Sequence, residues 1–377
     1  MKIACFNVEN MFRRAVVLNQ KTWEAGKPIL EAYNDLSELL QKPTYSDADK
    51  ERMLELFEQI GLVNLQEQKY TEENKWVILR RSRGKLLSKQ DGKVRVVAKG
   101  RNDWIGWLDL TREEVDEVAT RNTAAVIADV NPDVLAVVEA EDRPALVRFN
   151  DYVLKLSQGT DKRFQHAMLI DGNDERGIDV GLYAKAGYPI VGMRSHVDDP
   201  SPNPRYPLFS RDCAEYEVEA GGQRILLLVN HFKSKGYGKQ EDNDKRREEQ
   251  AERVKEIYEE RITEGFDNIV VLGDLNDTPD RPPLAPLLRE TTLKEASELP
   301  GWVWGEREGT WGDTQKTKFD YLLLSPPLAE KVKAGGVNRK GVWHAPGAKD
   351  PWETLPTLEE PEQAASDHAA VWVELEL

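Results

Sequence analysis

Residues 268–275 read NIVVLGDL, and this short segment constrains the fold more than any other part of the chain. A continuous apolar run rich in β-branched residues is typical of a strand that is covered on both faces. The run ends at Asp274, and Asn276 follows two residues later. A buried carboxylate is costly unless it is paired or bound to a metal. The chain must therefore bury this strand and give the Asp274 carboxylate a partner where the strand ends.

Seven further segments have the composition of strands. RILLLVNHF, near 224–232, is also continuously apolar, which again predicts a strand covered on both faces. AEYEVEA, near 214–220, alternates between apolar and polar residues, and such a strand has one solvated face. The others are KIACFNV near 2–8, VLAVVEA near 134–140, DVGLYA near 179–184, FDYLLLS near 319–325 and AAVWVELEL near 369–377.

Helical patterns lie between these strands. In DNDKRREEQAERVKEIYEERITEG, apolar residues recur at helical spacing, and Gly265 marks the expected end of the helix. Thr111 and Glu114 have the spacing of a capping box, which predicts a helix over about 112–129. The pair Asn131-Pro132 then ends it. Strands mixed with helices over the whole chain favour an α/β class in which sheet packs on sheet.

Residues 20–110 differ in character from the rest of the chain. Two helical patterns are followed by a basic stretch, in which Asp91 is the only acidic residue between positions 80 and 101. Its nine basic residues are Arg80, Arg81, Arg83, Lys85, Lys89, Lys93, Arg95, Lys99 and Arg101. The pair Asp91-Gly92 predicts a hairpin turn. The stretch is either a solvated hairpin that covers a sheet edge or a cationic arm for a polyanion, with Trp76, Trp104 and Trp107 available for stacking.

The composition sets broad limits on location and partners. A net charge of −15 argues against a protein that coats nucleic acid nonspecifically, although it allows an enzyme that acts on phosphates. No apolar run is long enough to span a bilayer, and the N-terminal segment lacks the features of a secretory signal. Cys5 and Cys213 lie in strand-like segments and are expected to be buried thiols. We therefore expect a cytoplasmic protein without a membrane partner, and nothing in the sequence specifies its oligomeric state.

Polar residues recur where the predicted strands begin or end, which suggests that they line one cleft. They are Asn7, Glu9, Glu139, Glu141, Asn230, His231, Asp274, Asn276, Asp320, Asp367 and His368. Oxygen ligands without cysteine suit magnesium, with manganese as the alternative, rather than structural zinc. The two histidines suit proton transfer and orientation. Phosphoryl transfer needs this combination of metal, base and groups that stabilise negative charge.

Six short blocks carry a resemblance to a known family: FNVEN at 6–10, VVEAED at 137–142, NHFKSKG at 230–236, GDLNDTP at 273–279, FDYLLLS at 319–325 and SDHAAV at 366–371. In order and wording they resemble the endonuclease/exonuclease/phosphatase (deoxyribonuclease-like) superfamily, and most of all its bacterial nuclease-like branch. The resemblance implies a four-layered α/β/β/α sandwich of two mixed sheets. The expectation is a single domain over residues 1–377, with residues 20–110 as a large insertion after the first strand.

The resemblance also implies a role for each matching residue. Glu139 corresponds to the principal metal ligand of the family, and Asn7 and Asp367 complete the metal site. Asp274 corresponds to the aspartate that activates the attacking water, with Asn276 as its partner.

Three further residues complete the catalytic set that the resemblance implies. Asp320 corresponds to the carboxylate that holds His368, and His368 and His231 correspond to the two histidines that contact the phosphate.

Several side chains remain open to two interpretations. Glu139 and Glu141 are two residues apart, so spacing alone cannot choose between them, and the resemblance selects Glu139. Asn230, Lys233, Arg176 and Arg211 are candidates for substrate binding. For the two arginines the alternative is a pair of structural ion pairs, and for Lys233 it is a solvated loop. His166, His196 and His344 have no motif context and are expected to be ordinary histidines.

Three functions compete. The first is a magnesium- or manganese-dependent phosphodiesterase, a nuclease that hydrolyses DNA or RNA through in-line attack of an activated water. The second is the same chemistry on a small-molecule or lipid phosphoester, as a phosphatase or phosphodiesterase. The third is a catalytically silent binding protein, which the complete set of catalytic residue types argues against.

Overall fold

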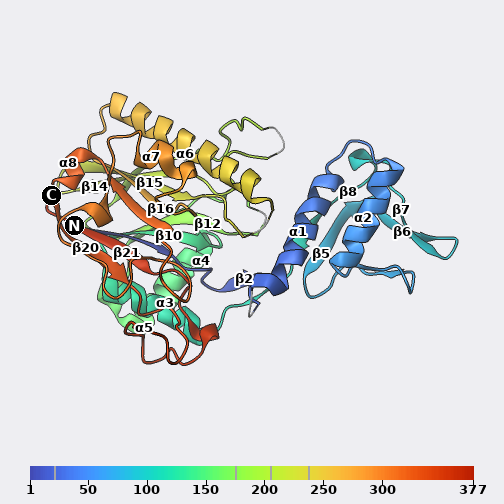
Figure 1. Cartoon of the computed structure of the whole chain (residues 1–377), viewed down its shortest axis with the longest axis horizontal. Helices are drawn as coiled ribbons and strands as arrows, with labels where there is room; N and C mark the ends of the chain where they lie inside the picture. Colours follow the sequence, from blue (N-terminus) through green and yellow to red (C-terminus); the bar gives the residue numbers. More distant parts are fainter. Residues whose placement is uncertain (21–22, 175, 204–205, 237) are drawn as a thin grey trace. The chain divides into compact units, whose positions relative to one another are not determined.

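The computed structural model describes residues 1–20, 23–174, 176–203, 206–236 and 238–377. The chain divides into two compact units, which are described separately (Figure 1). The larger unit comprises Met1–Phe12, Val115–Lys235 and Lys239–Leu377, and the smaller unit comprises Arg13–Glu114 together with Gly236 and Gly238. The predicted insertion, residues 20–110, falls inside the smaller unit.

The first sheet of the larger unit has seven strands in the order β11-β12-β10-β1-β21-β20-β18. The neighbours β1 and β10 are parallel, as are β18 and β20, and the other pairs are antiparallel. The strands are β1 Lys2–Asn7, β10 Val134–Ala140, β11 His166–Leu169, β12 Asp179–Ala184, β18 Trp302–Val303, β20 Val332–Asn338 and β21 Ala370–Leu375.

The second sheet has six strands in the order β13-β14-β15-β16-β19-β17. Only β15 and β16 are parallel among the pairs described, so this sheet is also mixed. The strands are β13 Ile190–Arg194, β14 Ala214–Ala220, β15 Gln223–His231, β16 Ile269–Asp274, β17 Lys294–Glu295 and β19 Asp320–Leu324. The predicted α/β class with two mixed sheets is confirmed, and every strand predicted from an apolar run is present.

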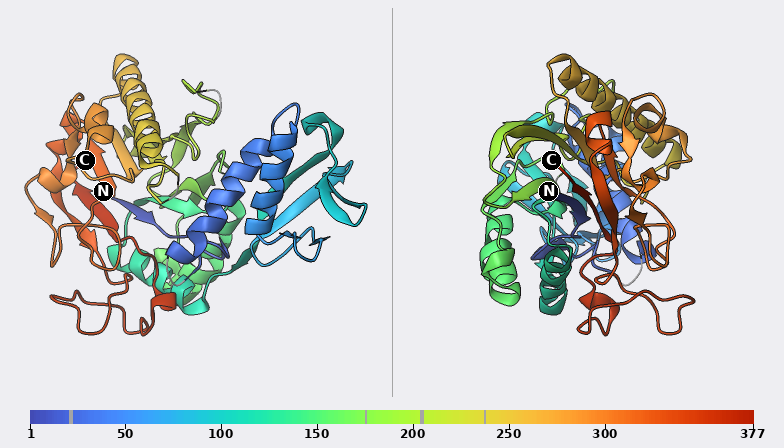
Figure 2. Two further views of the ribbon diagram at one scale, coloured as in Figure 1. Left: turned by 45° about the vertical axis from the view of Figure 1, so that its right-hand side comes forward. Right: turned by 90° about the vertical axis from the view of Figure 1, so that its left-hand side faces the viewer.

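The two sheets share one apolar core. Alternate residues of β1 and β10, among them Ile3 and Ala136, belong to the same buried cluster as Leu227 of β15 and Val270 of β16. The opposite face of the first sheet packs against α3, and the opposite face of the second packs against α6 and α7. The layers therefore run helix, sheet, sheet, helix (Figures 1 and 2).

Helices α3, α6 and α7 of the larger unit lie on the outer faces of the sheets, whereas Leu328 of α8 belongs to the core between them. The long helix α6 presents Ala251, Val254 and Ile257 to the second sheet, and the chain leaves it at Gly265, whose φ of 95° suits glycine. The α-helices are α3 Glu117–Val130, α4 Arg143–Arg148, α5 Lys155–Gln158, α6 Gln240–Thr263, α7 Ala285–Leu288 and α8 Pro326–Ala329. Within the part of the chain that the structure describes, no helix is both long and apolar enough to cross a membrane.

The predicted start of α3 was wrong. Residues Arg112–Glu114 form strand β9, which pairs with β2, Arg13–Ala15, instead of opening a helix. The helix begins at Glu117, and Asp116 caps it by accepting hydrogen bonds from two backbone N–H groups of the first turn. Pairing between strands satisfies the backbone of 112–114. The helix is capped by Asp116 and not by the predicted capping box of Thr111 and Glu114.

The smaller unit has its own core, in which two helices pack against short strands. Leu36, Phe57, Leu79 and Leu108 are among its buried residues. Its elements are β2 Arg13–Ala15, α1 Trp23–Leu40, α2 Asp47–Gln59, β3 Val63–Asn64, β4 Lys69–Tyr70, β5 Val77–Arg83, β6 Leu87–Gln90, β7 Lys93–Val96, β8 Ile105–Leu110 and β9 Arg112–Glu114. The predicted hairpin is confirmed, because β6 and β7 pair across Asp91 and Gly92, both of which have positive φ.

His196 is a core residue of the larger unit, with an exposed fraction of 4%. Its Nδ1 lies 3.0 Å from Asp199 Oδ2, and its Nε2 lies 2.6 Å from Glu215 Oε1. Arg253 pairs with the same aspartate and Arg261 with the same glutamate. Burial disfavours the charged imidazole, but the hydrogen bond to Glu215 and the charge of Asp199 outweigh it and raise the pKa of His196.

This network makes stability depend on pH. We expect His196→Gln to lower the free energy of unfolding by about 2 kcal/mol near pH 6, because hydrogen bonds to charged groups contribute about that much. The contribution is complete below the pKa of an unfolded histidine, about 6.5, and is lost as pH rises through the raised folded value. Urea unfolding of both proteins at increasing pH should show their difference shrinking. A difference that stays constant or widens would contradict a charged His196.

Candidate active site

The second sheet brings three predicted site residues side by side. His231 is the last residue of β15 and pairs with Asp274, the last residue of β16, which in turn pairs with Asp320, the first residue of β19. Gly273 makes this register possible, because its φ is 140° and a Cβ there would lie 1.9 Å from the backbone oxygen of Asn230. The strand order therefore places one histidine and two carboxylates in neighbouring positions at the same end of the sheet.

The first sheet supplies Asn7 and Glu139. Asn7 ends β1 and pairs with Val138, and Glu139 follows as the extra residue of a β-bulge on β10. The backbone of Glu139 has a φ of 64°, a conformation that costs a non-glycine residue free energy. Such strain, where it is tolerated, commonly marks a functional position.

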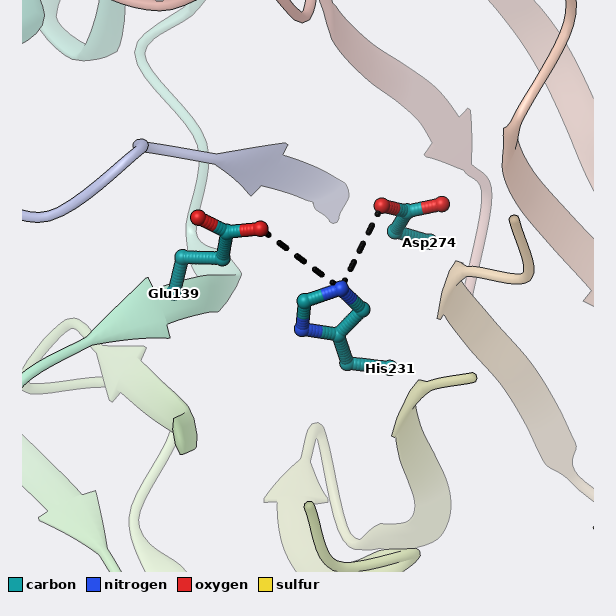
Figure 3. Close-up of side chains that lie close together, drawn as sticks. All are labelled: Glu139, His231 and Asp274. Carbon is teal, nitrogen blue, oxygen red and sulfur yellow. Dashed lines mark ion pairs between the residues drawn. The ribbon is translucent and has the colours of Figure 1, made fainter. Parts of the chain in front are cut away.

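Glu141 has a different environment from Glu139. Its carboxylate accepts the backbone N–H groups of Met11 and Phe12, at 3.1 and 2.5 Å, and it is largely buried. It therefore holds the segment that follows β1. The Glu139 side chain is 20% exposed and points towards His231 and Asp274 (Figure 3). The bulge thus separates two glutamates that the sequence spacing could not distinguish.

The Asp274 carboxylate is the centre of the site. Its Oδ2 accepts hydrogen bonds from the amide groups of Asn7, at 3.2 Å, and Asn276, at 3.1 Å, and its Oδ1 accepts the backbone N–H of Asn276 at 2.8 Å. The Nε2 atoms of His231 and His368 lie 3.5 and 3.7 Å from Oδ2. Groups from both sheets therefore converge on one carboxylate.

The surroundings of Asp274 also change its basicity. Burial raises the pKa of the Asp274 carboxyl; the charge of His368 opposes this shift and that of Asp320 adds to it. A carboxylate in this setting is a stronger base than one on the surface.

His368 is held as an imidazolium. Its Nδ1 lies 2.8 Å from Asp320 Oδ2, and its Nε2 also faces Asp367 at 3.8 Å. Burial disfavours the charged ring, but the negative charges of Asp320 and Asp274 outweigh it and raise the pKa of His368 well above that of an ordinary histidine.

His231 has the opposite protonation state. Burial, together with the positive charges of Arg211 and Arg176, lowers the pKa of His231 well below that of an ordinary histidine. Its Nε2 lies 3.6 Å from Glu139 Oε1 and 3.5 Å from Asp274 Oδ2, so this nitrogen of the neutral ring faces both carboxylates. The two histidines of the site therefore differ in charge, a difference that their similar sequence contexts do not reveal.

The residues fit a divalent cation. Among the described residues, two groups offer ligand atoms within 4.8 Å of one another: Glu139 with His231 and Asp274, and Asp274 with Asp320 and His368. Several carboxylates share a buried space with one charged histidine, and a divalent cation would offset that excess of negative charge. The buried Nδ1 of His231 and Oδ1 of Asp320 also have no hydrogen-bond partner among residues whose placement the structure gives.

Asn7 and Asp367, the other predicted metal ligands, lie in different surroundings. The Asn7 amide directs its NH₂ group towards Glu139 and Asp274, while its oxygen accepts the backbone N–H of Glu9 at 3.1 Å. Asp367 is 45% exposed and belongs to neither of the two groups above. Asn7 therefore lies at the centre of the site, and Asp367 lies beside His368.

The two arginines that were candidates for substrate binding both pair with Asp174. Arg176 donates to it from Nε at 2.8 Å, and Arg211 donates to it from a terminal nitrogen at 3.3 Å and to the backbone oxygen of Phe232 at 2.5 Å. Their charges reach the site through space, since both lower the pKa of His231.

Asn230 and Lys233 lie close to His231 in the chain, and both are buried. Asn230 donates to the backbone oxygen of Leu228 at 2.9 Å, and its own Oδ1 has no partner in the described part of the chain. Lys233 donates to the backbone oxygen of Ser234 at 3.1 Å. Burial, then the charges of Arg176 and Arg211, lowers the pKa of Lys233 to about 6. The predicted alternative of a solvated loop does not describe Lys233, which is 4% exposed.

Trp311 lies at the edge of the site, and the sequence interpretation missed it. Its Nε1 donates to Asp367 Oδ2 at 2.8 Å, and its ring stacks on Phe319 with 4.9 Å between centroids. The ring also lies 6.5 Å from that of His368 and is 37% exposed. The available signal was a tryptophan in the otherwise polar segment EGTWGDTQKT.

Three solved structures are similar to this chain, and all three are distant from it in sequence. A mannosyl-6-phosphatase from Bacteroides thetaiotaomicron is 17% identical with a TM-score of 0.48, covering 69% of this chain and 92% of that one. An endonuclease/exonuclease/phosphatase family protein from the same organism is 18% identical with a TM-score of 0.49, covering 68% and 86%. Truncated TDP2 from Caenorhabditis elegans is 18% identical with a TM-score of 0.46, covering 68% and 91%. No curated protein sequence matches the chain significantly.

A family model gives the decisive match. The model of the endonuclease/exonuclease/phosphatase family matches residues 97–305, more than half of the chain. This segment contains Glu139, His231 and Asp274, while Asn7 and His368 lie outside it. The chain therefore belongs to the endonuclease/exonuclease/phosphatase family, a group of phosphoesterases.

Proposed function

We propose that the chain is a divalent-metal-dependent phosphodiesterase that hydrolyses DNA or RNA by in-line attack of an activated water. The observation that carries this proposal is the environment of Asp274, whose carboxylate is oriented by Asn7 and Asn276 and lies between a charged and a neutral histidine. A base and an adjacent cation are what attack on a phosphodiester requires.

In the proposed hydrolysis, Asp274, His368 and His231 have different roles. Asp274, oriented by Asn276, accepts a proton from the attacking water, and burial makes it basic enough for that task. The imidazolium of His368, held by Asp320, stabilises the negative charge that develops on the phosphate oxygens. His231 contributes through a hydrogen bond and not through charge, because its ring is neutral.

Glu139 would hold the metal ion, with Asn7 and Asp367 as the further predicted ligands. A magnesium ion keeps several of its waters and needs only one or two protein carboxylates, which suits the partly exposed Glu139. A manganese ion would also accept the neutral imidazole of His231. When bound, the cation supplies Lewis-acid polarisation of the phosphate oxygens.

The proposal is tested by hydrolysis of plasmid DNA, linear single-stranded DNA, RNA and a generic phosphodiester, each with magnesium, manganese and chelator. Metal-dependent cutting of a nucleic acid is the expected result. Hydrolysis of the generic diester alone would transfer the same mechanism to a small-molecule substrate, and hydrolysis of phosphomonoesters alone would indicate a phosphatase.

Asp274→Asn should lower kcat by about 10²–10⁴-fold, because it removes the base and keeps the shape of the side chain. The protein should still fold, and the melting temperature reports the hydrogen bonds that the carboxylate no longer accepts from Asn7 and Asn276. Asp280→Asn, which changes an exposed aspartate nearby, is the matched control and should leave both quantities unchanged. Near-normal turnover of Asp274→Asn would refute the mechanism.

Glu139→Gln and Glu141→Gln should separate the two glutamates. Glu139→Gln should raise the metal concentration needed for half-maximal rate by about tenfold or more, with little change in stability. Glu141→Gln should lower the free energy of unfolding by about 1–2 kcal/mol, because its carboxylate accepts two backbone N–H groups. Metal titrations of the rate and urea unfolding measure both, and the reverse pattern would show that Glu141 is the ligand.

A further inference from the structure

Five of the nine basic residues between positions 80 and 101 are exposed and make neither an ion pair nor a side-chain hydrogen bond within the described ranges. Arg80 pairs with Asp109 at 2.8 Å and Arg81 pairs with Glu72 at 3.1 Å, and Arg83 and Arg101 donate to backbone oxygens. Across those ranges no ion pair is formed by the other five, which are Lys85, Lys89, Lys93, Arg95 and Lys99. Their charge is thus available to a partner outside the chain.

The hairpin of β6 and β7 presents three of these cations on a rigid support. Its two strands form a sheet of their own, so the hairpin does not extend the edge of another sheet. Val94 and Val96 are buried in the core of the smaller unit, and Lys93 and Arg95 alternate with them on the outer face. Lys89 lies on the neighbouring strand opposite Val94, so its exposed side chain leaves the hairpin on the other face from Lys93 and Arg95. The hairpin projects from the rest of this unit (Figure 1).

A second sheet of the same unit presents an exposed tryptophan. One face of β5 and β8 is buried through Leu79 and Leu108, and the other carries Arg80 directly opposite Trp107. Trp107 is 47% exposed, and its Nε1 donates to Asp109 Oδ1 at 2.8 Å, while Arg80 donates to the other oxygen of that carboxylate. The indole is therefore held in place with its ring open to solvent.

The distribution of charge distinguishes this unit from the rest of the chain. Residues 13–114 contain 19 Lys or Arg and 17 Asp or Glu, whereas the remaining residues contain 33 and 50. The smaller unit therefore has a slight net positive charge and the larger unit a net negative one, which favours contact of a polyanion with the smaller unit.

We propose that the β6–β7 hairpin and the exposed face of β5 and β8 form a binding surface for single-stranded nucleic acid. The five cations that form neither an ion pair nor a side-chain hydrogen bond contact the phosphate backbone, and Trp107 stacks on a base. A solvent-facing indole beside cationic side chains is the arrangement on which an unpaired base stacks. The inference rests on the proposed function, because it takes the bound polymer to be the phosphodiester that the site cleaves.

The test measures binding apart from hydrolysis. Fluorescence anisotropy of a labelled single-stranded DNA oligonucleotide, with EDTA present and at increasing salt, gives the affinity of the full chain. Replacing Lys89, Lys93 and Arg95 together by glutamine should weaken binding about tenfold or more at low salt. It should also reduce the slope of log affinity against log salt by about 2, since each lost phosphate contact removes about 0.7. Trp107→Ala should weaken binding about tenfold without changing the slope.

A matched variant removes the same charge from the same unit. Replacing Lys27, Arg52 and Lys69 by glutamine takes away three cations that pair with Glu31, Glu55 and Glu67, and it should change the affinity by less than about twofold. The hairpin variant should keep the wild-type melting temperature and the wild-type rate on a small phosphodiester.

Three outcomes would overturn the inference. They are equal loss of affinity in the hairpin and matched variants, an unchanged salt slope, and binding of anionic lipid vesicles in preference to the oligonucleotide. Each is distinguishable from failure of the proposed function. Wild-type cleavage of nucleic acid with no effect of the hairpin changes would leave the enzyme proposal standing, and tight binding without any cleavage would leave the surface standing.

Discussion

Burial of the Asp274 carboxylate at the end of a core strand is the constraint on which the rest of the site depends. A charge in that position must be compensated, and the compensation comes from both sheets: Asn7 and His368, which precedes β21, from the first, and His231, Asn276 and Asp320 from the second. Packing two sheets face to face therefore brings together polar groups that one strand alone could not place around Asp274. A divalent cation would offset the excess of carboxylates that remains.

The surroundings of His231 and His368 explain why the two histidines differ in protonation state. His368 bonds to a carboxylate through one nitrogen and faces others, so its positive charge is stabilised. His231 is buried near Arg176 and Arg211, whose own negative partner, Asp174, is shared between them. Burial, reinforced by this ion-pair cluster, thus lowers the pKa of His231, although the cluster does not contact Asp274. Burial and neighbouring charge, not residue type, decide which imidazole carries a proton.

Much of this arrangement could be predicted from the sequence, for local reasons. Core strands such as β15 and β16 consist of apolar runs, and the polar residues that end them indicate where the site lies. Strand β20, VKAGGVN, has no such run and depends on its pairing with β21, so its sequence gives no signal. The choice between Glu139 and Glu141 depended on a β-bulge, and the start of α3 on a pairing with β2, and both are tertiary effects.

The basic stretch at 80–101 also shows that tertiary contacts cannot be read from the sequence, in this case the ion pairs of its side chains. Nine cations in the segment 80–101 predict a positive surface, but the sequence does not say which are already neutralised. Folding pairs Arg80 and Arg81 with carboxylates and buries Trp104, whose Nε1 donates to Tyr45, leaving Trp107 exposed. The cations that folding leaves unpaired can contact the phosphates of a bound polyanion without first breaking an ion pair. The sequence therefore gives the number of basic residues in this segment, and the structure identifies which of them we expect to set the salt dependence of binding.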